Sequence, residues 1–312
     1  MNQHEQDPLR SKDSAPADEG QGDNRDLVRA EPGQDTQGGP EAAGMSAEAP
    51  PMAPSKVYPE DLEISWSWAH FVVFAIFGFV CLVAIQGVLA VIYAPHQRMT
   101  QKQLEEYLIG KPQFAIGSLL IWYATIFFFL YVTLSLLRGH RFWQTLGWRK
   151  LNPSNKEMPK NPLVYLLAGC GLSLFVALLT ANMKAPEHTP MEELFKYRQT
   201  ALLFVAMAVL VAPLVEETLF RGYLYPMFAR SFGVGPSILL TGLLFGLMHG
   251  AQLGWTWSLV GMLTLVGIIF TLVRARTGTV FASFLMHLGY NALISIAAMI
   301  STHGFTKMPS AN

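Results

Sequence analysis

Six polar side chains capable of chemistry lie in the last third of the chain, inside segments that are otherwise apolar. A charged side chain at the centre of a bilayer costs about 2.5 kcal/mol or more, so each one needs a partner or a task. Carboxylates and imidazoles at that depth are suited to proton transfer, which indicates a working site. The six residues are Glu216, Glu217, Arg221, His249, His287 and Asn291.

The two adjacent glutamates differ in the partner that their spacing allows. In a helix, Glu217 and Arg221 are four residues apart and share a face, so they can form an ion pair. This pair has two interpretations, a bond that fastens helices together or a part of the working site. Glu216 points in another direction and lacks this partner. An unpaired carboxylate at membrane depth suits proton transfer.

The histidines and the asparagine lie at the same depth as the glutamates. His287 and Asn291 are four residues apart, so their side chains project from one helix face. A lone histidine in an apolar helix is more often a core residue than a ligand, but two histidines beside two carboxylates favour a site. With a rise of about 1.5 Å per residue, Glu216, His249, His287 and Asn291 fall in one layer near the membrane middle.

Seven apolar segments approach the length of about 20 residues that crosses a bilayer. The fifth is the shortest, and its Gly242 and Gly246 would allow close packing against a neighbouring helix. Residues 101–109 offer a possible eighth helix, which is amphipathic and suited to the interface. We therefore predict an all-α, multi-pass transmembrane helical bundle. The predicted spans are 68–94, 114–137, 163–182, 201–229, 236–249, 255–273 and 279–300.

The first part of the chain has a different composition. Residues 1–56 contain 11 of the 22 acidic residues, 5 of the 22 basic residues and no aromatic residue. Such a segment buries too little apolar surface to offset its ordering entropy, and we predict a disordered polar tail. The rest divides into N-terminal transmembrane helices and loops at 57–200, a catalytic transmembrane region at 201–300 and a short tail at 301–312.

The distribution of lysine and arginine predicts the orientation in the membrane. These residues gather after the second predicted span and after the sixth, where Arg274 and Arg276 lie. By the positive-inside rule both loops are cytoplasmic, which places the N-terminus inside the cell and the C-terminus outside. Lys184, Lys196 and Arg198 count against this arrangement. We predict a multi-pass cell-membrane protein whose surroundings are the lipid bilayer, with no nucleic-acid partner.

The polar residues occur in an order that resembles the CPBP family of intramembrane proteases. This family includes the type II CAAX prenyl endopeptidases and the Abi or bacteriocin-processing proteins. Its signature is Glu-Glu-x-x-x-Arg, then Phe-x-x-x-His, then His-x-x-x-Asn or Asp. The resemblance covers about residues 201–300, and a Leu-Gly-Trp-Arg stretch at 146–149 is also similar to the family. The signature positions here are Glu216, Glu217, Arg221, Phe245, His249, His287 and Asn291.

The resemblance implies an endopeptidase that acts within the membrane. It implies that Glu216 and His249 activate a water for attack on the scissile carbonyl, while His287 and Asn291 donate to the developing oxyanion. The second glutamate and the arginine of the first motif would orient or electrostatically support that set.

Participation of a metal is open at the level of sequence. Two histidines and a carboxylate match the ligands of a catalytic zinc ion, and the family has been labelled metalloprotease, so zinc is possible. However, the chain has no His-Glu-x-x-His spacing, and Asn291 is a poor zinc ligand. A glutamate-activated water without a metal fits these residues at least as well.

The substrate and two competing functions are also open. A membrane peptide or protein is the expected substrate, with prenylated CAAX-type peptides and pheromone or bacteriocin leaders as alternatives. The acidic tail favours a different role, a non-catalytic scaffold or immunity-type protein that binds a membrane peptide or a sensor. A transporter with a carboxylate proton relay ranks third, because neither an internal repeat nor a second glutamate-bearing span is evident in the sequence.

Overall fold

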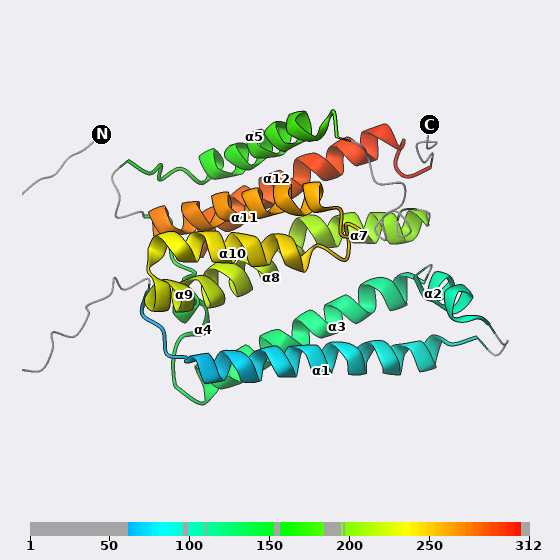
Figure 1. Ribbon diagram of the computed structural model, residues 1–312, viewed down its shortest axis with the longest axis horizontal. Helices are drawn as coiled ribbons and strands as arrows, with labels where there is room; N and C mark the ends of the chain where they lie inside the picture. Colours follow the sequence, from blue (N-terminus) through cyan, green and yellow to red (C-terminus); the bar gives the residue numbers. More distant parts are fainter. Residues whose placement is uncertain are drawn as a thin grey trace, which may run out of the picture. The chain divides into compact units, whose positions relative to one another are not determined.

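All regular structure in the described part of the chain is helical, which confirms the all-α class (Figure 1). The predicted disordered tail, residues 1–56, lies outside the described residues, as does the end of the predicted C-terminal tail. The division into domains therefore stays a prediction. The computed structural model describes residues 62–95, 99–109, 111–152, 157–183, 195 and 197–306.

Six helices are long and apolar enough to cross a membrane, and they confirm the multi-pass helical fold. A seventh apolar helix, α10 (Val234–Met248), is shorter, as the fifth predicted span is. The possible eighth helix forms as α2 (Gln101–Ile109), but its nine residues are too few to cross a bilayer. The long helices are α1 (Trp68–Tyr93), α3 with η2 (Pro112–Leu136), α5 (Pro162–Thr180), α7 to α9 (Arg198–Phe232), α11 (Trp257–Thr277) and α12 (Val280–Ser301).

Two of these long helices contain a π-helical segment. In the first, α3 (Pro112–Leu130) continues into η2 (Tyr131–Leu136), and the short helix α4 (Phe142–Thr145) follows. Single π-helical turns within α-helices are often found at functional sites. In the fourth long helix the π-helical segment directly follows the two glutamates. That helix consists of α7 (Arg198–Leu210), α8 (Ala212–Glu217), η3 (Thr218–Leu224) and α9 (Tyr225–Phe232).

The sixth predicted span ends later than the sequence pattern indicated. Helix α11 continues to Thr277, and Gly278 ends it with a left-handed backbone (φ 70°), a conformation that glycine adopts at little cost. Arg274 and Arg276 therefore lie in the last helical turn, and their predicted place in a loop is wrong. Thr279 then starts α12, since its side chain accepts a hydrogen bond from the Phe281 amide.

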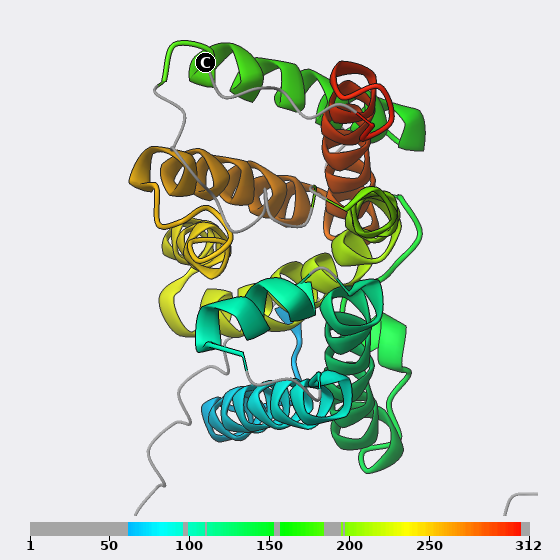
Figure 2. The same cartoon turned by 90° about the vertical axis from the view of Figure 1, so that its right-hand side faces the viewer.

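Glycines set the closest helix contacts around the site. Figures 1 and 2 show α10 beside α11, and a Cβ atom on Gly242 would lie 2.6 Å from the Ile268 amide nitrogen. A Cβ atom on Gly246 would lie 2.7 Å from the Val260 carbonyl oxygen, on the same partner helix. The predicted close packing through these two glycines is confirmed. It brings the end of α10 against α11.

Helix α1 packs on α3 and presents most of its surface away from the bundle (Figure 1). Its contact with α3 includes a 2.8 Å hydrogen bond from Trp122 Nε1 to the Gly78 carbonyl. Its outward residues are apolar, and Val73 and Phe79 are each more than half exposed. An apolar face of this extent is stable where lipid covers it.

Candidate active site

Glu217 and Arg221 form a fully buried ion pair, as their spacing predicts. Arg221 Nη1 donates to Glu217 Oε1 at 2.9 Å. The guanidinium also donates from Nη2 to the Gly267 carbonyl at 2.8 Å and from Nε to Thr271 Oγ1 at 3.2 Å. A buried charge is tolerated when it is both paired and hydrogen-bonded, and this arginine meets both conditions.

Aromatic rings enclose the same guanidinium. Its central carbon lies 4.6 Å from the centre of the Phe245 ring and 5.4 Å from that of Phe270. The faces of such rings attract a cation, and the attraction is strongest where water is excluded. Phe245 belongs to α10 and Phe270 to α11, so the arginine of η3 is held between both helices. This arrangement gives the motif phenylalanine a physical role.

His287 is oriented by the buried glutamate. Its Nδ1 lies 3.0 Å from Glu217 Oε1, the oxygen that also accepts from Arg221. Because a carboxylate paired with a guanidinium is ionised and only accepts, we assign the hydrogen to Nδ1 of His287. The Nε2 edge of the ring therefore faces the other glutamate.

His249 is oriented by its own helix. It stands directly after α10, and its Nδ1 lies 2.7 Å from the Phe245 carbonyl one turn earlier. A carbonyl oxygen can only accept, so Nδ1 of His249 carries a hydrogen and Nε2 is turned toward the site.

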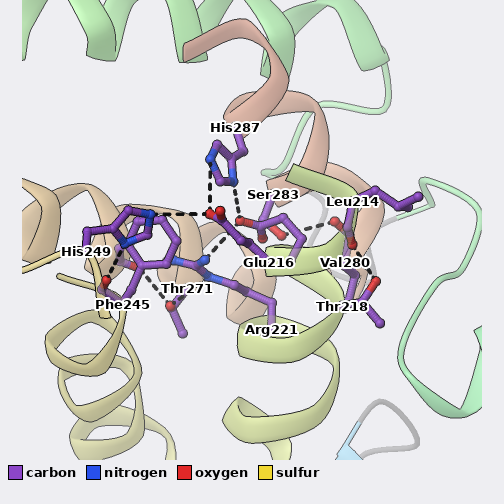
Figure 3. Close-up of polar contacts among 12 residues, drawn as sticks. Leu214, Glu216, Thr218, Arg221, Phe245, His249, Thr271, Val280, Ser283 and His287 are labelled. Atoms are coloured by element: carbon purple, nitrogen blue, oxygen red, sulfur yellow. Dashed lines mark hydrogen bonds and ion pairs between the residues drawn. The ribbon is translucent and has the colours of Figure 1, made fainter. Parts of the chain in front are cut away.

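The two histidines converge on one oxygen of Glu216 (Figure 3). His249 Nε2 and His287 Nε2 each lie 3.8 Å from Glu216 Oε2. This distance is too long for a direct hydrogen bond, so a water or a ligand that contacts both groups can join them. In their neutral forms both imidazoles would present a lone pair to the carboxylate. Glu216 Oε2 and the two Nε2 atoms would then all be acceptors. Such a group is stable only when a proton or a hydrogen-bond donor lies among them.

Asn291 lines the same cavity but is partly engaged elsewhere. Its Nδ2 donates to the Ala208 carbonyl of α7 at 2.8 Å. An amide nitrogen has two hydrogens, so one remains for a second acceptor. The structure thus brings together all four residues that were predicted to share one layer, namely Glu216, His249, His287 and Asn291.

A cavity of about 350 Å³ extends from this polar layer. Its walls are mainly apolar and come from α3, α5, α7, α8, α10, α11 and α12. The lining reaches Thr180 and Ala298, near the ends of α5 and α12, and Gln252 in the loop after α10. A hollow of this volume with a few converging polar groups is typical of a ligand site. The cavity runs toward the end of the bundle at which α7 and α11 begin.

Comparison with known proteins bears on the same residues. Residues 198–293 match the family model described as type II CAAX prenyl endopeptidase Rce1-like. The matched region spans less than a third of the chain and is similar to this family. The match confirms the resemblance predicted from the three motifs, and it contains all six polar residues. Comparisons with curated proteins and with solved structures gave no match.

The Rce1-like match indicates protease activity in general, and the six apolar helices indicate a multi-pass membrane protein. Both conclusions concern the class of protein. The role of each site residue, the substrate and the orientation in the membrane remain predictions.

The Rce1-like region includes supporting groups that the sequence reasoning missed. The six polar residues named from the sequence lie on the fourth, fifth and seventh predicted spans, and the sixth has no charged residue at that depth. Helix α11 instead provides the Gly267 carbonyl, the Thr271 hydroxyl and the Phe270 ring to Arg221. Thr271 is fully buried, but in the sequence it is only one of several small polar residues in that apolar run.

The donor set of the Rce1-like region does not fit a metal ion well. Two ligands of a tetrahedral zinc ion lie about 3.3 Å apart, given bonds of about 2.0 Å, whereas each histidine nitrogen is 3.8 Å from the glutamate oxygen. The described residues contain no group of three or more His, Cys, Asp or Glu side chains placed to hold a metal. Glu217 is already bound to an arginine.

Proposed function

We propose that this protein is an intramembrane endopeptidase that hydrolyses peptide bonds of membrane-associated substrates with a water activated by Glu216 and His249. The observation that carries the proposal is the convergence of both histidine Nε2 atoms on Glu216 Oε2 at 3.8 Å. The Rce1-like match supports a protease, and the apolar cavity supports a substrate segment that is itself apolar.

The two histidines have different partners, and this difference supports different roles. The Nδ1 atom of His287 contacts the Glu217 carboxylate, whereas the Nδ1 atom of His249 contacts the neutral carbonyl of Phe245. An imidazolium is stabilised more by a carboxylate than by a carbonyl. In the proposed mechanism His287 carries a hydrogen on both ring nitrogens and donates from Nε2, and His249 accepts through Nε2.

In the proposed reaction, a water between Glu216 and His249 donates one hydrogen to each of them. Its oxygen attacks the scissile carbonyl carbon while Glu216 takes the proton that the water loses. The carbonyl bond opens to an oxyanion, which accepts from His287 Nε2. When the carbon–nitrogen bond breaks, the departing amine takes the proton from Glu216. The products are a carboxylic acid and an amine, and the carboxylate of Glu216 is restored.

Asn291 supports the same oxyanion. The hydrogen of Nδ2 that is not bound to the Ala208 carbonyl is its available donor. A fixed donor in a water-poor site stabilises developing charge at little reorganisation cost, and loss of one such donor lowers kcat by about 100-fold or more.

The proposal is tested by measuring which membrane peptides accumulate in cells. Mass spectrometry would compare cells that contain the wild-type protein with cells that contain Glu216→Gln, a variant that retains the size of the side chain. We expect precursor peptides to accumulate with Glu216→Gln. Glu63→Gln is the matched control, because Glu63 is exposed and lies outside the Rce1-like region. Unchanged cleavage in the Glu216→Gln cells would contradict the proposal.

The non-catalytic alternative makes the opposite prediction. If the protein binds a membrane peptide or a sensor without cleaving it, simultaneous replacement of Glu216, His249, His287 and Asn291 leaves the cellular phenotype unchanged. The endopeptidase proposal expects this variant to behave as a deletion, provided that it reaches the membrane in wild-type amounts.

For the substrate class, we propose prenylated CAAX-type peptides. The mainly apolar lining of the cavity supports a substrate with a large apolar group, and the family is named for prenyl endopeptidases. Purified protein would be given a farnesylated peptide and the same peptide without the prenyl group. Preferential cleavage of the farnesylated form supports this substrate, and equal cleavage argues for an apolar peptide segment instead.

A further inference from the structure

The segment at residues 146–149 lies before the region that matches the Rce1-like family, and the proposed reaction does not use it. It follows α4 and contacts both η3 and the start of α12. On one side, a Cβ atom on Gly222 of η3 would lie 2.6 Å from the Leu146 carbonyl oxygen. On the other side, the Gly147 carbonyl accepts a 2.9 Å hydrogen bond from the Val280 amide. The segment therefore joins the helix of the two glutamates to the helix of His287.

Trp148 is the residue of this segment that reaches the glutamates' helix with a side-chain hydrogen bond. Its Nε1 donates to Thr218 Oγ1 at 3.0 Å. Thr218 is fully buried, directly follows Glu217 and is the first residue of η3. Its hydroxyl donates in turn to the Leu214 carbonyl at 2.6 Å. Because this hydroxyl both accepts and donates, its direction is fixed, and the indole holds the start of η3.

The same indole packs against α12. Its ring centre lies 5.3 Å from that of Phe284, which is three residues, or about one helical turn, before His287. The residue after Trp148 is also tied to α12, since Thr279 Oγ1 donates to the Arg149 carbonyl at 2.8 Å. One side chain thus contacts both the helix that carries Glu217 and the helix that carries His287.

The contact between those two helices at the site is short. His287 Nδ1 lies 3.0 Å from Glu217 Oε1, and a hydrogen bond of this kind weakens steeply when its length or angle changes. A small shift of η3 against α12 would therefore turn the His287 ring. Among the described residues that line the cavity, none belongs to residues 146–149, so the indole can affect the site only through the helices it contacts.

We propose that Trp148 is a positioning residue of the peptidase site, which maintains the hydrogen bond between Glu217 and His287 by holding the start of η3 against α12. Its effect on catalysis rests on the proposed function. Its effect on that hydrogen bond does not, so the two can be measured separately.

Nuclear magnetic resonance of the full chain, labelled with ¹⁵N-histidine and held in detergent micelles, tests the hydrogen bond. A ring N–H that donates to a carboxylate exchanges slowly with water and has a downfield proton signal, which is assigned to His287 by its loss in His287→Gln. Trp148→Phe removes the Nε1 hydrogen and retains an aromatic ring beside Phe284. We expect this variant to broaden or abolish the His287 signal.

Trp143→Phe is the matched control. Trp143 lies in the same loop and is 46% exposed, and its indole nitrogen forms no hydrogen bond with the described residues. The same chemical change at this position should leave the His287 signal as in the wild type. If Trp148→Phe fails to fold, Thr218→Val breaks the same hydrogen bond from the other side and should have the same effect on the signal.

Kinetics with the farnesylated peptide test the effect on catalysis, with rates expressed per amount of folded protein from size-exclusion chromatography. Trp148→Phe should lower kcat about fivefold with unchanged KM, since one ordinary hydrogen bond corresponds to about that factor. Adding Trp148→Phe to Thr218→Val should cause no further fall in kcat, because the acceptor is already absent. Thr218→Ser retains the hydroxyl and should retain the wild-type kcat.

Three results would overturn the positioning role. One is a His287 signal that is the same in Trp148→Phe and Trp143→Phe. Another is a fall in kcat that multiplies when Trp148→Phe and Thr218→Val are combined, since the two residues would then act independently. The third is a rise in KM in place of a fall in kcat. If the wild-type protein cleaves no peptide, the proposed function fails, and the His287 signal still decides whether Trp148 holds the hydrogen bond.

Discussion

Replacement of each of the two adjacent glutamates in turn should have very different effects on the free energy of unfolding. Glu217→Met leaves the Arg221 guanidinium buried without its carboxylate, since the 2.9 Å ion pair is lost and both side chains are fully buried. Loss of one member of a buried pair typically costs about 3–5 kcal/mol. Glu216→Met removes a carboxylate that is 17% exposed and forms no direct hydrogen bond with the described residues. We expect it to change the free energy of unfolding by less than about 1 kcal/mol.

The assay is equilibrium unfolding in mixed detergent and dodecyl sulfate micelles, followed by circular dichroism. The double variant Glu217→Met with Arg221→Met is the internal control, because removal of both charges together avoids the unpaired cation and should recover much of the lost stability. The reasoning is refuted if Glu217→Met is as stable as Glu216→Met. It is also refuted if the double variant is no more stable than Glu217→Met alone, because an unpaired buried Arg221 would then not be the cause of the lost stability.

Three further predictions follow from the surroundings of the site. Thr271→Val removes the acceptor of Arg221 Nε and should lower kcat about tenfold with little change in KM, whereas Thr271→Ser should retain activity. Gly246→Val places a side chain against the α11 backbone and should reduce the yield of folded protein in size-exclusion chromatography, unlike the same change at Gly261, where the space is open. With the predicted orientation, Gln252→Cys in a cysteine-free background should react with an impermeant maleimide added to intact cells.

The spacing of charged residues predicted the central contacts because helix geometry is local. The four-residue interval of Glu217 and Arg221 gives the ion pair, and counting the helical rise gives a common layer for Glu216 and both histidines. Neither inference needs knowledge of which helices are neighbours. It needs only that the segments are helical and cross the same membrane.

The contribution of α11 could not be predicted in that way. Gly267 acts through a backbone carbonyl, which every residue has, and Thr271 resembles any small polar residue of an apolar helix. Their roles depend on α10 and α11 packing closely enough to surround Arg221, which is a property of the tertiary structure. The end of α11 was misplaced for a related reason. Hydropathy falls at Arg274, but that side chain is fully buried, and the helix continues to its glycine cap.

Charge neutrality connects the buried pair to the proposed chemistry. Glu217 and Arg221 cancel each other, so they add no net charge to the site. The same Glu217 oxygen nevertheless accepts from His287 Nδ1 and orients that ring. In the proposed mechanism a carboxylate on Glu216 balances an imidazolium on His287, so the whole set is neutral before water is deprotonated. In a medium where an isolated charge is costly, this balance allows two carboxylates, an arginine and a protonated histidine to lie within one site. In the proposed mechanism Arg221 therefore acts by holding Glu217, which orients His287, although Arg221 does not line the cavity.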